Sequence, residues 1–261
     1  MDLFIPYLVT TSFIQLKTVA ITVDRDLDSI LDLLLNLTSV LSLTKLIIVV
    51  HFPHYISPGS AAGPILFYNC LPQLKTFIFD SAYQEQIVIS PYDTLLMTTS
   101  NNLVSLTMNF CYTDDLINVL VYCSNLSYLN IQAGKSTQSV IISSNISLSK
   151  LKHFKLKCLD YGFGYDNVQT LLAMMPNLKV FELAVHYPSK IWTEGQKVKE
   201  LCAKILFVTF KIDIRLWSDK NKVDEILSRF LDDDYWHHVQ HFYEDENNNN
   251  YWHITANGSY Y

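Results

Sequence analysis

Glycine is scarce in this chain, at seven of 261 residues. Loops that cradle phosphate groups and the turns of Gly-rich β-barrels both need glycine's conformational freedom, so the low count argues against each. The Gly-x-Ser-x-Gly elbow of many hydrolases does not occur, and Gly162-Phe-Gly164 is not followed by the third glycine of a dinucleotide-binding loop. We therefore expect a protein that is not an enzyme and that uses no cofactor.

Cysteine is sparse as well, and its spacing is uninformative for metal or redox chemistry. No Cys-x-x-Cys pair occurs, and the number of cysteines is odd: Cys70, Cys111, Cys123, Cys158 and Cys202. An odd, dispersed set is typical of a reduced compartment, so we expect a cytoplasmic protein, with the nucleus as the alternative. The same residues fall within strand and helix patterns, which favours small core side chains over reactive thiols.

Long apolar runs and basic patches are also lacking. The most apolar stretch, Val40 to Phe52, is interrupted by Lys45 and is too short to span a bilayer, so no membrane association is expected. The N-terminus does not have the basic start of a signal peptide. The net charge is −6, and the excess lies from Asp219 onward, where there are nine acidic residues and three basic ones. Nucleic-acid binding needs a basic footprint, so we expect no nucleic-acid partner.

What the chain does contain is a repeated pattern of three large apolar residues at offsets 0, 3 and 5. Successive triplets begin 27, 31, 29, 23, 25, 27 and 29 residues apart. The eight triplets are Leu16/Val19/Ile21, Leu43/Leu46/Ile48, Leu74/Phe77/Phe79, Leu103/Leu106/Met108, Leu126/Leu129/Ile131, Leu151/Phe154/Leu156, Leu178/Phe181/Leu183 and Phe207/Phe210/Ile212. This period is typical of leucine-rich repeats, in which a strand and a helix form one turn of a solenoid.

Offsets 3 and 5 point to the same face of a strand, so each triplet predicts a short strand with one buried face. Helical patterns follow several of the triplets. We expect Asp26, Thr113 and Asp166 to begin three helices, and Thr193 with Gln196 to form a capping box at a fourth. Each helix has an apolar stripe that its own repeat cannot bury, and stacking of neighbouring repeats would bury it.

Three sequence segments show a family resemblance: LPQLKTFIFD, MPNLKVFELAV and the C-terminal segment ILSRFLDDDYWHHVQHFYEDENNNNYWHIT. Together with the triplets they resemble the leucine-rich-repeat region of F-box proteins, including a closing helix, a Trp-containing strand and a last aromatic strand. The resemblance implies substrate recognition for ubiquitin ligation. No F-box is recognisable before Leu16, so a Skp–cullin complex is an expected partner only if an F-box lies upstream. The Asn or Cys usual at offset 8 is matched only by Cys111, so the repeats should be irregular.

We therefore predict an α/β leucine-rich-repeat solenoid of about eight irregular strand–helix repeats. Residues 1–217 should form the solenoid. Residues 218–261 should form a capping helix and an aromatic β-hairpin packed on the same domain. Asp232–Asp234 is expected to be a solvated helix end.

The candidate binding residues lie at offsets 2, 4 and 6, which point away from the core and line the concave strand face. In the middle repeats these are Ser105, Thr107, Asn109, Tyr128, Asn130, Gln132, His153, Lys155 and Lys157. This polar row, with one aromatic residue and its bases at one side, suits a protein or peptide ligand that carries an acidic segment. The alternative is that these side chains bind no ligand and form a solvated strand face.

Two other functions compete with a binding module. The solenoid could be a scaffold that assembles with copies of itself. A metal site or catalytic site would have to use the histidines of the tail, where His237 and His241 are expected to share one face of a strand. The alternation around Trp236, Val239 and Phe242 instead favours a hairpin whose histidines are exposed, so we assign no metal ligand.

Overall fold

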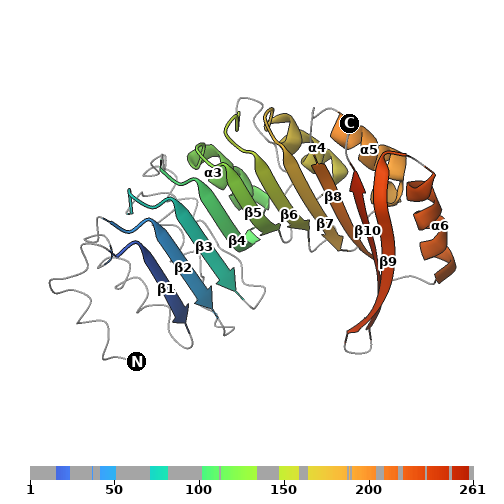
Figure 1. The fold of residues 1–261 in the computed structure, drawn as a ribbon, viewed down its shortest axis with the longest axis horizontal. Coiled ribbons are helices and arrows are strands. Elements are labelled where there is room, and N and C mark those ends of the chain that lie inside the picture. The colour runs from blue at the N-terminus through green and yellow to red at the C-terminus, as the bar shows by residue number, and fades with distance from the viewer. Residues whose placement is uncertain are drawn as a thin grey trace. The chain divides into compact units, whose positions relative to one another are not determined.

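The structure is a computed structural model. It describes residues 16–23, 37, 42–50, 71–81, 102–111, 113–133, 147–158, 164–186, 188, 190–203, 209–216, 220–232, 234–246 and 249–258. The chain divides into two compact units, residues 1–127 and 128–261. Both mix strands with helices, and most of the strand pairs are parallel (Figure 1).

The first unit contains parallel strands that pair in chain order. They are β1 (Thr18–Val23), β2 (Lys45–Val50), β3 (Thr76–Ser81) and β4 (Ser105–Cys111), and helix α3 (Thr113–Tyr122) follows β4. Leu116, Val119 and Leu120 of α3 are buried, as is Cys123 just after it. The helix therefore begins at Thr113, where the sequence placed its start.

The second unit has strands in the order β5-β6-β7-β8-β10-β9. The strands are β5 (Tyr128–Ala133), β6 (His153–Cys158), β7 (Val180–His186), β8 (Thr209–Leu216), β9 (Trp236–Glu246) and β10 (Asn249–Gly258). The helices are α4 (Tyr165–Ala173), η3 (Lys190–Thr193, a 3₁₀ turn), α5 (Gly195–Ala203) and α6 (Lys220–Leu231). Strands β5 to β8 are parallel, whereas β10 is antiparallel to both β8 and β9. The predicted helix and closing aromatic hairpin are thus confirmed, and the hairpin is hydrogen-bonded to the same sheet.

In every predicted triplet, the residues at offsets 3 and 5 lie on a strand. From β2 to β8 the residues at offsets 3 and 5 are at most 2% exposed, as with Phe181 and Leu183 of β7. In β1 the corresponding Val19 and Ile21 are half-buried. Phe207, which opens the last triplet, lies outside the described residues, as does the helix predicted at Asp26. The alternation of buried and accessible positions separates a core face from a second face that carries the polar side chains.

The turns that lead into the strands repeat the same hydrogen bonds. The amide of the first triplet residue donates to the carbonyl three residues earlier in four repeats: Leu74 to Leu71, Leu126 to Cys123, Leu151 to Leu148, and Leu178 to Met175. The asparagine before the triplet also reaches back to the preceding turn. Asn102 Nδ2 donates to the Pro72 carbonyl, and Asn177 Nδ2 donates to the Ser149 carbonyl at 2.8 Å. Equivalent positions in the turns therefore form equivalent hydrogen bonds within each unit.

A row of aromatic rings crosses the core face of the second unit. Phe154, Phe181 and Phe210 occupy paired positions on β6, β7 and β8. Their rings stack with centroids 5.5 and 5.3 Å apart. The next position in register is Gly258, and beyond it Trp236 of β9 contacts Phe210 with a centroid distance of 5.8 Å. Gly258 contributes no side chain at its position, but the rings on either side of it, Phe210 and Trp236, are still in contact.

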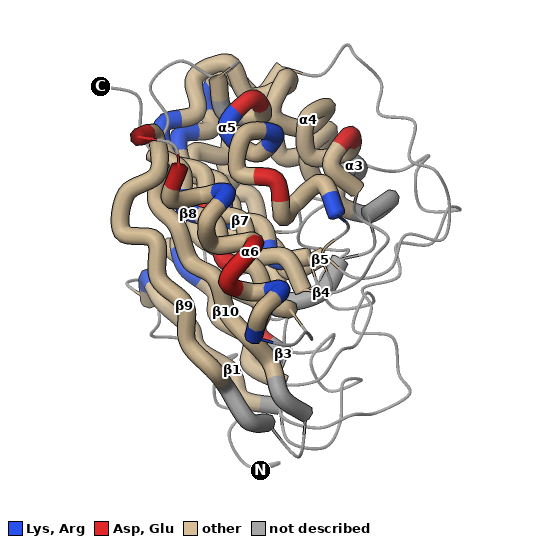
Figure 2. Tube along the Cα trace, turned by 90° about the vertical axis from the view of Figure 1, so that its right-hand side faces the viewer, with Lys and Arg blue, Asp and Glu red and all other residues tan. Residues whose placement is uncertain are grey.

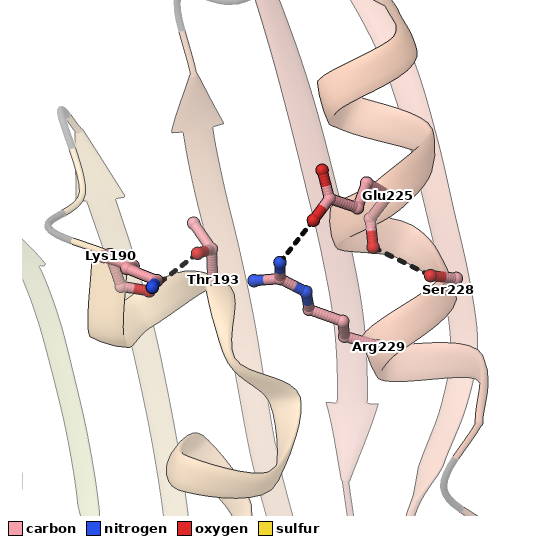
Figure 3. Close-up of polar contacts among 5 residues, drawn as sticks. All are labelled: Lys190, Thr193, Glu225, Ser228 and Arg229. Carbon is pink, nitrogen blue, oxygen red and sulfur yellow. Dashed lines mark hydrogen bonds and ion pairs between the residues drawn. The ribbon is translucent and has the colours of Figure 1, made fainter.

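Two predicted helix caps are wrong. Helix α4 has Gly164 at its N-cap, and Asp166 lies in its first turn, where the carboxylate is favoured by the helix dipole. Thr193 belongs to η3, where its hydroxyl donates to the Lys190 carbonyl at 2.6 Å (Figure 3). The capping box is wrong because α5 begins at Gly195 and the Val198 amide donates to the Glu194 carbonyl, so Glu194 occupies the N-cap position.

Helices η3, α5 and α6 pack closely against one another. Trp192 of η3 is 1% exposed, and its ring lies 5.3 Å from that of Tyr165 in α4. A Cβ on Gly195 would lie 2.6 Å from the Arg229 carbonyl oxygen, so α5 approaches the backbone of α6. On α6 itself, Arg229 forms an ion pair with Glu225 at 2.5 Å, one helical turn earlier (Figure 3). Asp232 and Asp234 beyond α6 are exposed, as expected of a solvated helix end.

Replacing Gly258 by alanine should destabilise the second unit. The added Cβ would fall within the Tyr235 ring, which packs edge to face on Trp236 at 4.8 Å. Crowding of this kind costs roughly 1–3 kcal/mol of unfolding free energy, measurable by chemical denaturation. Gly164→Ala is the comparison variant, since a Cβ there meets nothing within 4 Å; it replaces the N-cap of α4, so its cost should stay below about 1 kcal/mol. Equal effects of the two substitutions would contradict the packing described for Gly258.

Candidate functional site: the open face of the second unit

The sheet of the second unit has one face against its helices and one face away from them. Phe230 of α6 contacts Trp236 edge to face at 5.1 Å, and Trp236 contacts Phe210, so the helix covers the face that holds the aromatic row. Figure 1 shows α4, α5 and α6 with the strands of this unit. We call the opposite face of β5, β6, β7, β8, β10 and β9 the open face.

All six predicted binding residues of the second unit lie on this open face. Tyr128, Asn130 and Gln132 of β5 alternate with buried residues, as do His153, Lys155 and Lys157 of β6. The pairing of β5 with β6 sets Tyr128 beside His153, Asn130 beside Lys155, and Gln132 beside Lys157. Ser105 and Thr107 alternate in the same way on β4 of the first unit, where they are half-buried, and the side chain of Asn109 lies outside the described residues.

A cluster centred on Glu182 of β7 joins three of these strands. His153 Nε2 donates to Glu182 Oε1 at 2.9 Å, and Lys155 Nζ lies 3.4 Å from Glu182 Oε2. The Tyr128 ring meets the His153 ring edge to face, with centroids 4.9 Å apart. The imidazole is therefore held between an aromatic ring and a carboxylate, which fixes its orientation on the surface.

The pKa of Glu182 reports the balance of forces in this cluster. Partial burial by itself raises the pKa of the carboxyl group. The hydrogen bond from His153 and the charge and hydrogen bond of Lys155 oppose that effect, and the pKa falls below its ordinary value of 4.5. Glu182 is thus a carboxylate at neutral pH, and its negative charge is neutralised within the cluster.

A second cluster lies where β8 meets the C-terminal hairpin. His253 of β10 is 8% exposed, and its Nδ1 lies 3.3 Å from Asp213 Oδ1 on β8. The Phe242 ring of β9 stacks on the His253 ring, with centroids 4.6 Å apart and planes 5° apart, and is itself 49% exposed. Nearby, the Arg215 guanidinium lies over the Tyr251 ring at 4.0 Å. The expectation that the tail histidines are exposed is wrong for His253, because a carboxylate and a ring cover it.

The sequence could have found part of this second cluster. Applied to the seventh and eighth triplets, the offset rule points to Glu182, Ala184, Lys211 and Asp213, which all face away from the core. Arg215 continues the same alternation on β8, two residues beyond the last offset of the rule. The hairpin residues have no such signal, because antiparallel pairing brings them beside β8 from a segment forty residues away.

The tail histidines do not converge on one face. His237 pairs with Asn257 and His241 pairs with Ile254, three positions apart on β10, so the two imidazoles lie on opposite faces of the hairpin. A bulge between these pairs, where His238 has a φ of 52°, changes the alternation. The prediction of a shared face is wrong for this reason. Within the part of the chain that the structure describes, no group of three His, Cys, Asp or Glu side chains could hold a metal ion.

The described cysteines have the environment of core residues. Cys123 and Cys158 are free thiols, each at most 1% exposed. Burial raises the pKa of Cys123 to about 12 and that of Cys158 further still, so neither is a thiolate at neutral pH. Cys70 lies outside the described residues, as do the side chains of Cys111 and Cys202.

Comparison with known proteins does not assign a function to these two clusters. No protein-family model matches the chain, and none of the curated proteins matches it in sequence. No helix in the described ranges has the length and apolarity needed to cross a bilayer. The site must therefore be interpreted from its own chemistry.

Glu182→Gln should lower the stability of the second unit at neutral pH and lose that effect in acid. A carboxyl group whose pKa is lowered on folding stabilises the fold above its unfolded pKa, near 4.5, and that contribution disappears as the pH falls through the lower folded value. The cluster is partly exposed, so the change should stay below about 1 kcal/mol. Thermal unfolding across pH measures it. In a His153→Asn, Lys155→Met background, the same substitution should have almost no effect; a full effect there would contradict the pairing.

His238→Gly should keep or raise stability, whereas His238→Val should lower it. A positive φ costs an L-residue roughly 1 kcal/mol, which glycine avoids and a β-branched residue increases. His238 is exposed, so lost side-chain contacts are a small part of the change. Denaturant midpoints of the two variants provide the measurement, and a more stable valine variant would argue against the bulge.

Proposed function

We propose that the chain is an irregular leucine-rich-repeat solenoid that serves as a non-enzymatic protein-interaction module. The repeat assignment is supported by the eight triplets on strands, by parallel pairing in chain order within each unit, and by the recurring turn hydrogen bonds. Solenoids of this kind bind through extended sheet faces. The open face offers such a surface.

The proposed binding function rests on one observation: the open face carries accessible aromatic rings next to charged side chains that are paired with one another. Tyr128 and His153 pack edge to face at the surface, and Phe242 is half exposed above His253. Aromatic residues set among polar neighbours are typical anchors of protein interfaces. The titratable groups next to them are held by one another, as His153 and Lys155 are by Glu182, which suits a rigid recognition surface.

The resemblance to the repeat region of F-box proteins extends the proposal to a cellular role. It implies that the bound protein is a substrate for ubiquitin ligation and that a Skp adaptor and a cullin join the complex through an F-box upstream of the repeats. The alternative is a repeat scaffold unconnected with ubiquitin.

The proposal is tested by affinity purification of the tagged protein from its own cells, with the open-face variant Tyr128→Ala/Lys155→Glu beside the wild type. The expected result is loss of the wild-type partners from this variant, because the substitutions remove an aromatic anchor and reverse a charge on the binding face. A Skp adaptor and a cullin among the wild-type partners would support the ubiquitin role, and their absence would favour the scaffold.

The control is Lys190→Glu/Lys220→Glu, which changes exposed residues of η3 and α6 on the other side of the sheet. It should keep the wild-type partners. Unchanged binding by the open-face variant, with its thermal unfolding also unchanged, would refute the assignment of the binding surface.

A further inference from the structure

On β5 to β8 the open face is basic, although the chain as a whole is acidic. On β5 to β8 and β10 this face carries four basic residues and two acidic ones: Lys155, Lys157, Lys211 and Arg215 against Glu182 and Asp213. The net charge of the chain is −6. Figure 2 shows both acidic and basic residues on α6, on the helix side. On β5 to β8, by contrast, basic residues outnumber acidic ones on the open face.

Both acidic residues that β5 to β8 carry on the open face are occupied by partners on the same face. Glu182 is bound by His153 and Lys155, and Asp213 lies against His253. The ammonium groups of Lys157 and Lys211, by contrast, have no ion-pair partner among the described residues. Two uncompensated cations thus remain on β6 and β8, one on each side of β7.

The residue between these cations is small. Ala184 of β7 is paired with Lys157 on one side and with Asp213 on the other, and Lys211 is paired with Glu182, the preceding residue of that face. With strands about 4.8 Å apart and alternate residues about 6.6 Å apart, the Lys157 and Lys211 backbones are about 12 Å apart. Ala184 leaves room for a ligand backbone to cross β7 between them.

We propose that an extended acidic segment of a partner protein binds across β6, β7 and β8 over Ala184, with its carboxylates on Lys157 and Lys211. This inference rests on the proposed interaction function and deepens it, because it fixes the chemistry and the place of the ligand. The bases of β6 alone led us to expect an acidic ligand. The proposed site places that ligand over β7, between one lysine of β6 and one lysine of β8.

Charge distribution favours an acidic peptide over a nucleic acid. Glu182 and Asp213 lie between the bases in register, so a phosphate backbone that followed the lysines would also face carboxylates. Nucleic-acid binding depends on several lysines and arginines that neutralise phosphates along a continuous strip. A peptide can place its few carboxylates at the lysines and neutral residues elsewhere.

The first experiment pans a display library of short random peptides against the whole protein. Peptides rich in Asp and Glu should be enriched, and their binding should weaken as salt is raised, because salt screens charges on an accessible face. Enrichment of basic or purely apolar peptides would overturn the proposal. So would binding of a labelled single-stranded oligonucleotide that is tighter than that of the enriched peptides.

The second experiment locates the site with matched charge reversals. Lys157→Glu/Lys211→Glu should weaken the enriched peptides at least about tenfold, since two attractive charges become repulsive. The helix-side control Lys190→Glu/Lys220→Glu has the same net charge and should keep wild-type affinity. Equal loss in both variants would mean that net charge alone governs binding, and the site would be wrong.

A third variant, Ala184→Trp, tests the crossing point without changing charge. The residue is half-buried on the open face, so a larger side chain should leave the core intact and block the ligand. The expected result is wild-type thermal unfolding with peptide binding lost. If cellular partners depend on Tyr128 and Lys155 while no acidic peptide is enriched, this inference fails and the proposed function stands.

Discussion

The structure of the second unit depends on the row of rings that runs from Phe154 through Phe181 and Phe210 to Trp236. Each ring sits at the same register position of its strand, so the stacking fixes strand pairing as well as burying apolar surface. A slip of one residue would turn these rings to the other face. The missing side chain at Gly258 leaves room for the Tyr235 ring. Trp236 contacts Phe210 across this position, and Phe230 of α6 closes the end of the row against Trp236.

That constraint also creates the candidate site. Because alternate residues of a strand point to opposite faces, fixing the rings on one side fixes the polar residues on the other. Lys155, Glu182 and Lys211 form one cross-strand line, and Lys157, Ala184 and Asp213 form the next. Core packing thus sets the spacing of the surface charges, although none of the core residues touches the open face.

Much of the fold can be predicted from the sequence, because the triplet pattern consists of the core residues themselves. Triplets such as Leu178/Phe181/Leu183 have a spacing that depends only on strand geometry and burial, so the residues at offsets 3 and 5 of each triplet lie on a strand. Helix caps were less predictable, because Thr193 is the last residue of a 3₁₀ turn and α5 begins two residues later, at Gly195. The His253–Asp213 contact and the bulge at His238 depend on tertiary pairing, which local sequence does not encode.

The antiparallel placement of β10 limits how the length of this protein could change. A strand and helix added between β7 and β8 would meet parallel neighbours on both sides and could reuse the turn bonds of the other repeats. A repeat added after β8 would have to displace β10, which holds that position through seven register pairs. Gain or loss of repeats by recombination should therefore be tolerated internally, and the closing hairpin should be inherited together with β8 as one segment.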